Sequence, residues 1–243
     1  MNRANADFDP LARWYKILEF VAFGKDLERA RFEFLNRLSV SGDVLMLGEG
    51  DGRCAARLAK LALGARILCV DSSQRMIERA SRRVGGDISS GRVTFKCADV
   101  LSFTPEFGRF DAVVTLFFLD CFDAAGVASI VARMDASLRP GALWLFADFA
   151  LPKRGMPLFR ARVWLKVLYA FFRLSTGLRV SKLPPSENIL TRAGWSRVEC
   201  RDFQWGLIRS AVYRRDSEMV NGESAARSDI LDRRTALMGL RPD

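Results

Sequence analysis

Three alternating glycines and one acidic residue form the part of this chain best suited to bind a ligand. The glycines directly follow the apolar run at 44–47, and they are Gly48, Gly50 and Gly52. Glycine lets the backbone turn sharply and approach a ligand closely, and the first amides of a following helix point at that ligand. Asp71 ends the next apolar run, where a carboxylate can accept hydrogen bonds from both hydroxyls of a ribose. The segment 43–71 therefore predicts a strand, glycine turn, helix and strand that bind a nucleoside.

The spacing of the glycines distinguishes between nucleoside ligands. A dinucleotide site of the G-x-G-x-x-G type requires glycine where this chain has Arg53. The G-x-G-x-G spacing instead resembles the first motif of the Class I S-adenosylmethionine-dependent methyltransferases. This resemblance implies that the turn holds the aminoacyl end of the cofactor S-adenosyl-L-methionine and that Asp71 holds its ribose. The chain departs from the family at Met46, where an acidic residue is usual, and Glu49 is the acidic residue within the turn.

A second carboxylate, Asp99, follows the strand predicted at 93–97. The Ala-Asp-Val sequence at this strand end resembles the adenine clamp of the family, in which the acid accepts from the exocyclic amine and the next residue offers its backbone amide. The family resemblance also places Ser72 and Met76 beside the ribose and adenine, and the residues after Thr115, from Leu116 to Phe122, in the pocket near the sulfonium. The cofactor-binding residues predicted in this way are Gly48, Glu49, Gly50, Gly52, Asp71, Ser72, Met76, Asp99, Val100 and Leu116.

Methyl transfer from a sulfonium requires the nucleophile, the methyl carbon and the sulfur to be held in line in a dry site. An unprotonated amine needs no base, whereas a phenol or alcohol requires a carboxylate, tyrosine or lysine, because the chain has no histidine. The candidates for this role are Tyr15, Asp120, Asp148 and Tyr169. Asp148 ends a strand that follows a Pro-Gly turn typical of the family. Two of the candidates have structural alternatives, since Asp120 can cap a helix predicted at 123–138 and Tyr15 can pack on the sheet.

The resemblance implies an α/β, Rossmann-like fold with a seven-stranded, mostly parallel sheet, helices on both faces and an antiparallel last strand. The chain has 243 residues and is 49% hydrophobic, which suits one domain. We expect an N-terminal helical arm at 1–40 that lies over the cofactor site. A methyltransferase core follows at 41–215, with a helical lid inserted at about 152–182, and the polar segment at 216–243 forms a tail.

The formal net charge of +10 suits three partners: nucleic acid, an anionic membrane surface or an acidic small substrate. A helix predicted at 160–179 combines a wide apolar face with a stripe of basic residues. This combination fits a lipid-like or aromatic acceptor taken from an anionic bilayer. Lys166 and Arg173 argue against a helix that spans the bilayer. An ordinary helix that covers the core is the structural alternative.

Composition excludes several other classes of protein. Without histidine, metal sites and catalytic triads that depend on histidine are excluded. The five cysteines are dispersed without a C-x-x-C pair, which favours reduced thiols and no metal site. The first ten residues lack the apolar stretch of a secretory leader, and no apolar run is long enough to span a bilayer. We therefore expect a cytoplasmic protein.

These patterns together predict a methyltransferase that uses S-adenosyl-L-methionine to methylate nitrogen or oxygen on a small, hydrophobic or lipid-like acceptor. An RNA or protein methyltransferase suits the charge, but the chain lacks the tetrapeptide with which base-methylating enzymes hold a flipped base. A non-catalytic member of the fold is a further alternative, which Met46 favours. Arg53 and the absence of a Tyr-x-x-x-Lys pair disfavour a nicotinamide oxidoreductase.

Overall fold

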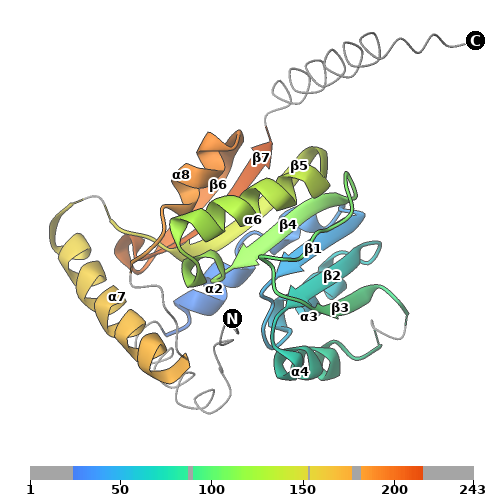
Figure 1. Cartoon of the computed structure of the whole chain (residues 1–243), viewed down its shortest axis with the longest axis horizontal. Coiled ribbons are helices and arrows are strands. Elements are labelled where there is room, and N and C mark those ends of the chain that lie inside the picture. The colour runs from blue at the N-terminus through green and yellow to red at the C-terminus, as the bar shows by residue number, and fades with distance from the viewer. Residues whose placement is uncertain (1–23, 87–89, 153, 177–181, 216–243) are drawn as a thin grey trace, which may run out of the picture.

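The computed structural model describes residues 24–86, 90–152, 154–176 and 182–215. It contains a seven-stranded sheet with the order β3-β2-β1-β4-β5-β7-β6 (Figure 1). The strands are β1 Asp43–Leu47, β2 Arg66–Asp71, β3 Val93–Cys97, β4 Phe110–Leu116, β5 Leu138–Phe149, β6 Trp195–Phe203 and β7 Ile208–Arg215. β7 is antiparallel to both of its neighbours, whereas the pairs formed by β1 to β5 are parallel. The predicted fold class is confirmed.

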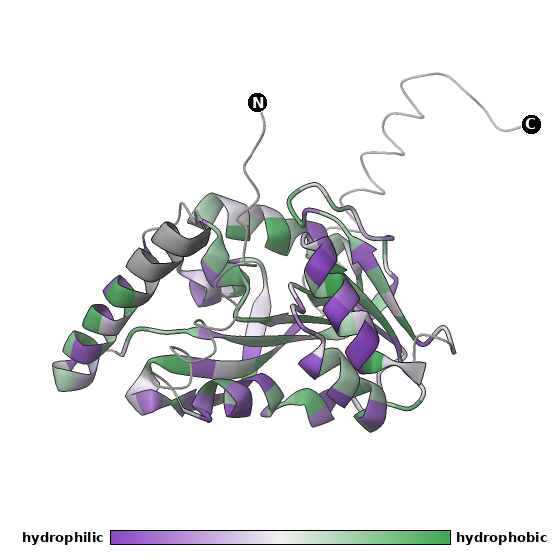
Figure 2. Ribbon diagram, turned by 90° about the horizontal axis from the view of Figure 1, so that it is seen from below, coloured by the Kyte–Doolittle hydropathy of each residue, from purple (hydrophilic) through white to green (hydrophobic). Residues whose placement is uncertain are grey.

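Helices cover both faces of this sheet. The α-helices are α2 Asp26–Phe32, α3 Arg53–Leu61, α4 Gln74–Val84, α6 Ala124–Ser137, α7 Gly155–Thr176 and α8 Ser186–Arg192. Three short 3-10 helices are η1 Leu35–Leu38, η2 Leu119–Cys121 and η3 Gln204–Gly206. Figure 2 shows the sheet nearly edge-on, with helices on its two sides. Within the described residues, no helix combines the length and the apolarity that a membrane crossing requires.

Alternating side chains of the strands supply the two halves of the core. Leu45 and Leu47 of β1 pack with α6 and α8, whereas Val44 and Met46 pack with η1, α3 and α4. Successive residues of a strand point to opposite faces, so a sheet covered on both sides is apolar at every position. Met46 is only 1% exposed. An apolar side chain is therefore well suited to the position at which the family usually carries an acid.

Side chains cap the starts of α4 and α6, and the structural alternative given for Asp120 is wrong. The Ser73 hydroxyl accepts from the Met76 amide at the start of α4, which ends at Gly85. At the start of α6 it is Asp123 that accepts from the Gly126 amide, at 2.7 Å. Asp120 therefore does not cap this helix, because Asp123 occupies the capping position and satisfies the amide of the first turn.

The helix predicted at 160–179 begins earlier, at Gly155, and α7 ends at Thr176. Pro157 lies in its first turn, where the missing amide costs no hydrogen bond. Ala161 and Leu165 of α7 are buried in an apolar cluster with Leu27 and Phe149, so the helix packs beside α2 and the end of β5. Figure 1 shows α7 at the outer side of the molecule, away from α4.

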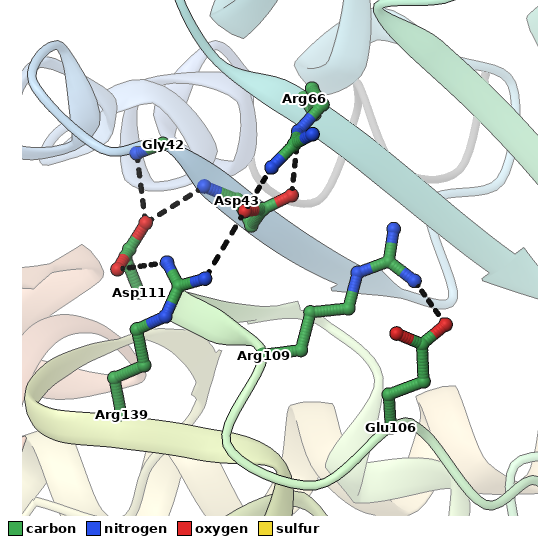
Figure 3. A network of polar contacts seen from close by, with 7 residues as sticks. All are labelled: Gly42, Asp43, Arg66, Glu106, Arg109, Asp111 and Arg139. Atoms are coloured by element: carbon green, nitrogen blue, oxygen red, sulfur yellow. Dashed lines mark hydrogen bonds and ion pairs between the residues drawn. The ribbon is translucent and has the colours of Figure 1, made fainter.

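A network of charged side chains links neighbouring strands at the amino edge of the sheet (Figure 3). The Asp111 carboxylate accepts from the amides of Gly42 and Asp43, at 2.9 and 2.8 Å. The buried Asp43 carboxylate accepts two hydrogen bonds from Arg66, and Arg139 contacts both acids. The hydrogen bonds from Arg139 and from the two amides outweigh desolvation and lower the pKa of Asp111. Ion pairs thus join β1, β2, β4 and β5 at the edge that lies away from the glycine turn.

Candidate cofactor and acceptor site

The glycine turn links β1 to α3 at the carboxyl edge of the sheet, and its three glycines have different uses. All three have positive φ, at 63°, 67° and 84° for Gly48, Gly50 and Gly52. A Cβ on Gly48 would lie 2.0 Å from the Phe118 ring, and one on Gly52 would lie 2.6 Å from the Ala80 Cα. A Cβ on Gly50 would meet no atom within 4 Å. Gly48 and Gly52 therefore permit close packing, whereas the space over Gly50 is open to a ligand.

Asp71 and the glycine turn form one hydrogen-bonded unit. The Asp71 carboxylate accepts from the Gly50 amide at 3.1 Å and from the Ser73 amide at 2.9 Å. Its side chain is partly exposed at the tip of β2, and partial burial raises the pKa of the carboxyl. The acid therefore orients the turn and remains within reach of a ligand that lies over Gly50.

Asp99 lies beside this unit, after the neighbouring strand. Asp71 pairs with Cys97 in the parallel register of β2 and β3, and the Ala98 amide donates to the Asp71 carbonyl at 3.0 Å. The exposed Asp99 carboxylate accepts from the Leu101 amide at 2.9 Å. The Val100 side chain is buried in the core, so its backbone is the part available to a ligand. The two predicted acids thus share the carboxyl edge of adjacent strands.

The remaining predicted cofactor contacts are at the same edge. Ser72 is exposed directly after β2, Met76 is partly exposed in the first turn of α4, and Leu116 is partly exposed at the tip of β4. This edge also contains the point at which the strand order reverses, between β1 and β4. Open α/β sheets bind their ligands at such a point, outside the carboxyl ends of the strands.

Glu49 is hydrogen-bonded to the start of α3. Its carboxylate accepts from the Ala55 amide at 2.9 Å and also from the Cys54 amide. Gly52 precedes α3 and has no side chain with which to cap the helix, so Glu49 satisfies the orphan amides from within the loop. Burial raises the pKa of Glu49 to about 7. The structure therefore gives Glu49 a role in fixing the turn.

These residues fit an adenosyl group. A Cβ on residue 50 would begin to fill the open space over Gly50, which we call the cradle. The two carboxylates at neighbouring strand tips are suited to ribose hydroxyls and to an exocyclic amine. Backbone amides at the start of α3 suit a carboxylate. The cofactor would thus be held by the turn, by Asp71 and by Asp99.

Asp120 and Asp148 form a buried pair of acids next to this cradle. The Asp148 carboxylate accepts from the Asp120 amide at 3.1 Å and from the Phe149 amide at 2.8 Å. The two residues are 7% and 2% exposed, so both acids are enclosed by the protein and Asp148 does not line an open cleft. Burial raises the pKa of Asp120 to about 6, and burial together with the neighbouring Asp120 charge raises the pKa of Asp148 well above its usual range. The pair therefore retains a proton that isolated carboxylates would lose.

Two phenylalanines from the stretch after Thr115 lie near the strand tips, together with one arginine that sequence reasoning missed. Phe118 covers Gly48, and Phe117 has a φ of 54° and contacts Phe149 edge-to-face at 5.5 Å between ring centroids. Arg31 of α2 places its guanidinium carbon 5.1 Å from the Phe117 centroid, and its charge acts on Glu49. The apolar run after 115 was a signal for the phenylalanines, but no local pattern identified Arg31. Tyr15 lies outside the described residues, as does the side chain of Tyr169.

The comparisons with known proteins agree with this geometry. A family model described as a methyltransferase domain matches residues 44–141, from β1 to the Pro-Gly turn within β5. A demethylmenaquinone methyltransferase from Leptospira interrogans (serovar copenhageni, strain Fiocruz L1-130) is 27% identical over 237 residues, which cover 89% of this chain and 91% of the relative.

Solved structures share the fold. The N-methyltransferase NodS from Bradyrhizobium japonicum WM9 superposes with a TM-score of 0.56 and 21% identity, over 78% of this chain and 97% of the other. The 1,6-didemethyltoxoflavin-N1-methyltransferase from Burkholderia thailandensis was solved with 1,6-didemethyltoxoflavin and S-adenosylhomocysteine. It superposes with a TM-score of 0.57 and 18% identity, over 88% of this chain and 93% of the other.

Residues 44–141 therefore form a methyltransferase domain, and the chain has the fold of the Class I S-adenosylmethionine-dependent methyltransferases. It is a methyltransferase whose cofactor is S-adenosyl-L-methionine.

Proposed function

We propose that the enzyme methylates a nitrogen or oxygen atom of a small, hydrophobic or lipid-like acceptor. An apolar groove of about 560 Å³ beside the carboxyl edge of the sheet supports this proposal most strongly. Its lining residues are Met156, Pro157, Phe159, Arg160, Val163, Trp164 and Trp205. Trp164 packs in one cluster with Phe117, which directly follows the tip of β4. The groove thus adjoins the strand ends at which a methyl group would be presented.

The names of the relatives support a small acceptor. The Leptospira relative is named for demethylmenaquinone, and the Burkholderia structure holds 1,6-didemethyltoxoflavin. In the proposed arrangement α7 belongs to a lid at about 152–182, and the arm at 1–40 covers the cofactor. Arg31 at the end of this arm supports that role, because its positive charge faces the turn that would receive the aminoacyl carboxylate.

When bound, the cofactor supplies an electrophilic methyl group on a sulfonium. The chain supplies position and dryness: Asp71 and Asp99 hold the adenosyl part, while the turn and Arg31 hold the aminoacyl part. For an acceptor hydroxyl we propose Asp120 as the base, since its pKa of about 6 leaves it ionised at neutral pH. Asp148 accepts from the Asp120 amide and thereby positions it.

Replacing Asp148 by asparagine is expected to flatten the dependence of stability on pH. Asp148 has a raised pKa in the folded protein, so folding takes up a proton above the usual carboxyl pKa, and stability falls as the pH rises. In the variant, residue 148 does not titrate, so this proton uptake on folding is absent. The variant's unfolding free energy should therefore gain on the wild type by up to about 1.4 kcal/mol per pH unit between pH ~4 and the raised pKa of folded Asp148, with no further gain outside this window.

Urea unfolding of both proteins at a series of pH values measures this difference. Parallel curves would show that Asp148 is ionised in the folded protein and would remove the proposed acid pair. The pH profile of methyl transfer supplies a second readout, because a positioning role for Asp148 requires its replacement to shift the apparent pKa of the base.

A series of acceptors tests the proposed substrate class. Phenols and amines with one reactive head and alkyl tails of increasing length are incubated with the enzyme and S-adenosylmethionine, and the gain of one methyl group is followed by mass spectrometry. A groove that buries the tail should raise kcat/KM by roughly fourfold per methylene, from about 0.8 kcal/mol per buried CH2. Rates independent of tail length, or methylation of RNA or protein alone, would contradict the proposal.

We further propose that the reaction takes place in the cytoplasm, next to an anionic membrane. Cys54 and Cys69 are buried free thiols, which suits a reducing compartment. The basic and apolar character of α7 supports the proximity to a membrane.

A further inference from the structure

α7 presents a second apolar face that no other element of the described residues covers. Met156, Phe159, Val163 and Val167 are 77%, 66%, 46% and 48% exposed, and Trp205 of η3 adds a side chain that is 70% exposed. The four helix positions are separated by three or four residues, so they form one stripe along the helix. Figure 2 shows apolar and polar positions alternating along α7. We call these five residues the α7 stripe.

The stripe is distinct from the face with which α7 joins the core. Ala161 and Leu165 are 1% and 6% exposed and pack with Leu27 of α2, Phe149 of β5 and Ile208 of β7. These contacts already anchor the helix. Much of the apolar surface of the stripe therefore remains in contact with water, which is unfavourable without a partner.

Basic residues surround the stripe. The segment 149–186 contains eight lysines and arginines and no aspartate or glutamate, so it carries most of the net charge of +10. Arg154, Arg162 and Lys166 are exposed on or next to α7. The Arg160 guanidinium carbon lies 3.8 Å from the Trp205 ring centroid, which joins η3 to the helix. The surface thus combines apolar side chains with a one-sided positive charge.

An anionic lipid bilayer matches this combination better than other partners do. A second copy of the chain would bring like charges together. RNA would stack on the rings of Phe159 and Trp205, but it would leave the aliphatic side chains of Met156, Val163 and Val167 in water. The segment 1–23 carries three basic and three acidic residues, so it offers no complementary charge. A helix with an apolar face and basic flanks lies in the interface of an anionic membrane, with its apolar side chains among the acyl chains.

We infer that the α7 stripe inserts into the surface of an anionic bilayer, with α7 parallel to the membrane plane and its basic residues at the lipid phosphates. This inference rests on the proposed function for its purpose, since the stripe shares Met156, Phe159, Val163 and Trp205 with the acceptor groove. A lipid-like acceptor would then pass from the bilayer along the groove to the strand tips, without crossing water.

Sedimentation of the full-length protein with vesicles tests the inference, without cofactor or acceptor. Vesicles of phosphatidylcholine that contain phosphatidylglycerol should bind the protein about tenfold more tightly than phosphatidylcholine alone, and added salt should weaken the binding. Val163→Asp should reduce binding by about tenfold, because a carboxylate would enter the apolar layer. Val198 of β6 is the matched control: it is 48% exposed, against 46% for Val163, and Val198→Asp should bind as the wild type does.

A second pair of variants tests the charge. Arg162→Glu should weaken binding to the anionic vesicles severalfold, whereas Arg192→Glu on the exposed side of α8 should have little effect. Equal binding to neutral and anionic vesicles, no binding to either, or the same loss in both members of a pair would overturn the inference. A wild-type dimer that the Val163→Asp substitution separates into monomers would also overturn the inference.

Turnover of a short-chain, water-soluble acceptor separates this inference from the proposed function. If that acceptor is methylated but the vesicles are not bound, the bilayer inference alone is wrong. If the vesicles are bound but no small acceptor is methylated, the proposed function is wrong. The inference that the α7 stripe binds an anionic bilayer would then still hold.

Discussion

Replacing Asp71 by alanine is expected to weaken the binding of S-adenosylmethionine by about a hundredfold. Two ribose hydroxyls would lose a charged acceptor, and hydrogen bonds to charged groups contribute roughly 1.5–3 kcal/mol each. The same carboxylate holds the Gly50 amide at 3.1 Å, so the turn also loses its anchor. Calorimetric titration of the variant and the wild type measures the ratio of the two dissociation constants.

Asp123→Ala is the control for this variant. Asp123 caps α6 through the Gly126 amide, so its removal should cost about 1 kcal/mol of stability and leave cofactor affinity unchanged. Because burial raises the pKa of Asp71, the wild-type affinity should also fall on acidification sooner than for an ordinary aspartate. An Asp71→Ala protein that binds as tightly as the wild type would contradict the assignment of the ribose site.

Gly50→Ala is expected to reduce cofactor affinity by at least about tenfold while the protein stays folded. The added methyl group would meet no protein atom within 4 Å, so the folded chain has room for it. The positive φ of 67° adds a conformational cost of roughly 1–2 kcal/mol. The methyl group would enter the space assigned to the cofactor. The cofactor, and not the protein, would therefore have to shift.

Gly108→Ala provides the matched control for Gly50→Ala. Gly108 also has a positive φ, at 59°, and open space around its Cβ, but it lies just before β4 at the amino edge of the sheet. Both variants should lose similar stability in thermal unfolding, and only Gly50→Ala should lose affinity. Equal affinities in the two variants would show that the space over Gly50 does not hold the ligand.

Much of the fold follows from local sequence patterns. β3 is predicted at 93–97 and observed at Val93–Cys97, because apolar and polar residues alternate along this segment. Ser73 and Gly85 delimit α4 as their capping chemistry predicts. Asp71 and Asp99 could be assigned to one edge because parallel strands end on the same side of a sheet.

Contacts between distant segments could not be predicted in this way. The Asp120 amide donates a hydrogen bond to Asp148, which lies 28 residues further along the chain. Both acids are enclosed in the fold, whereas their positions at strand ends alone would predict exposed side chains. Arg31 reaches the turn because α2 packs beside the end of β5, which no periodicity in its own segment reveals. Glu49 turns back to α3 because the residue before the helix is a glycine.

A crystal structure of the wild-type enzyme with S-adenosylhomocysteine tests the central assignment most directly. The expected complex has both ribose hydroxyls within hydrogen-bonding distance of the Asp71 carboxylate, adenine beside Asp99 and the ligand lying over Gly50. A ligand bound elsewhere on the chain, with Asp71 left to its own backbone contacts, would contradict the site described for this enzyme.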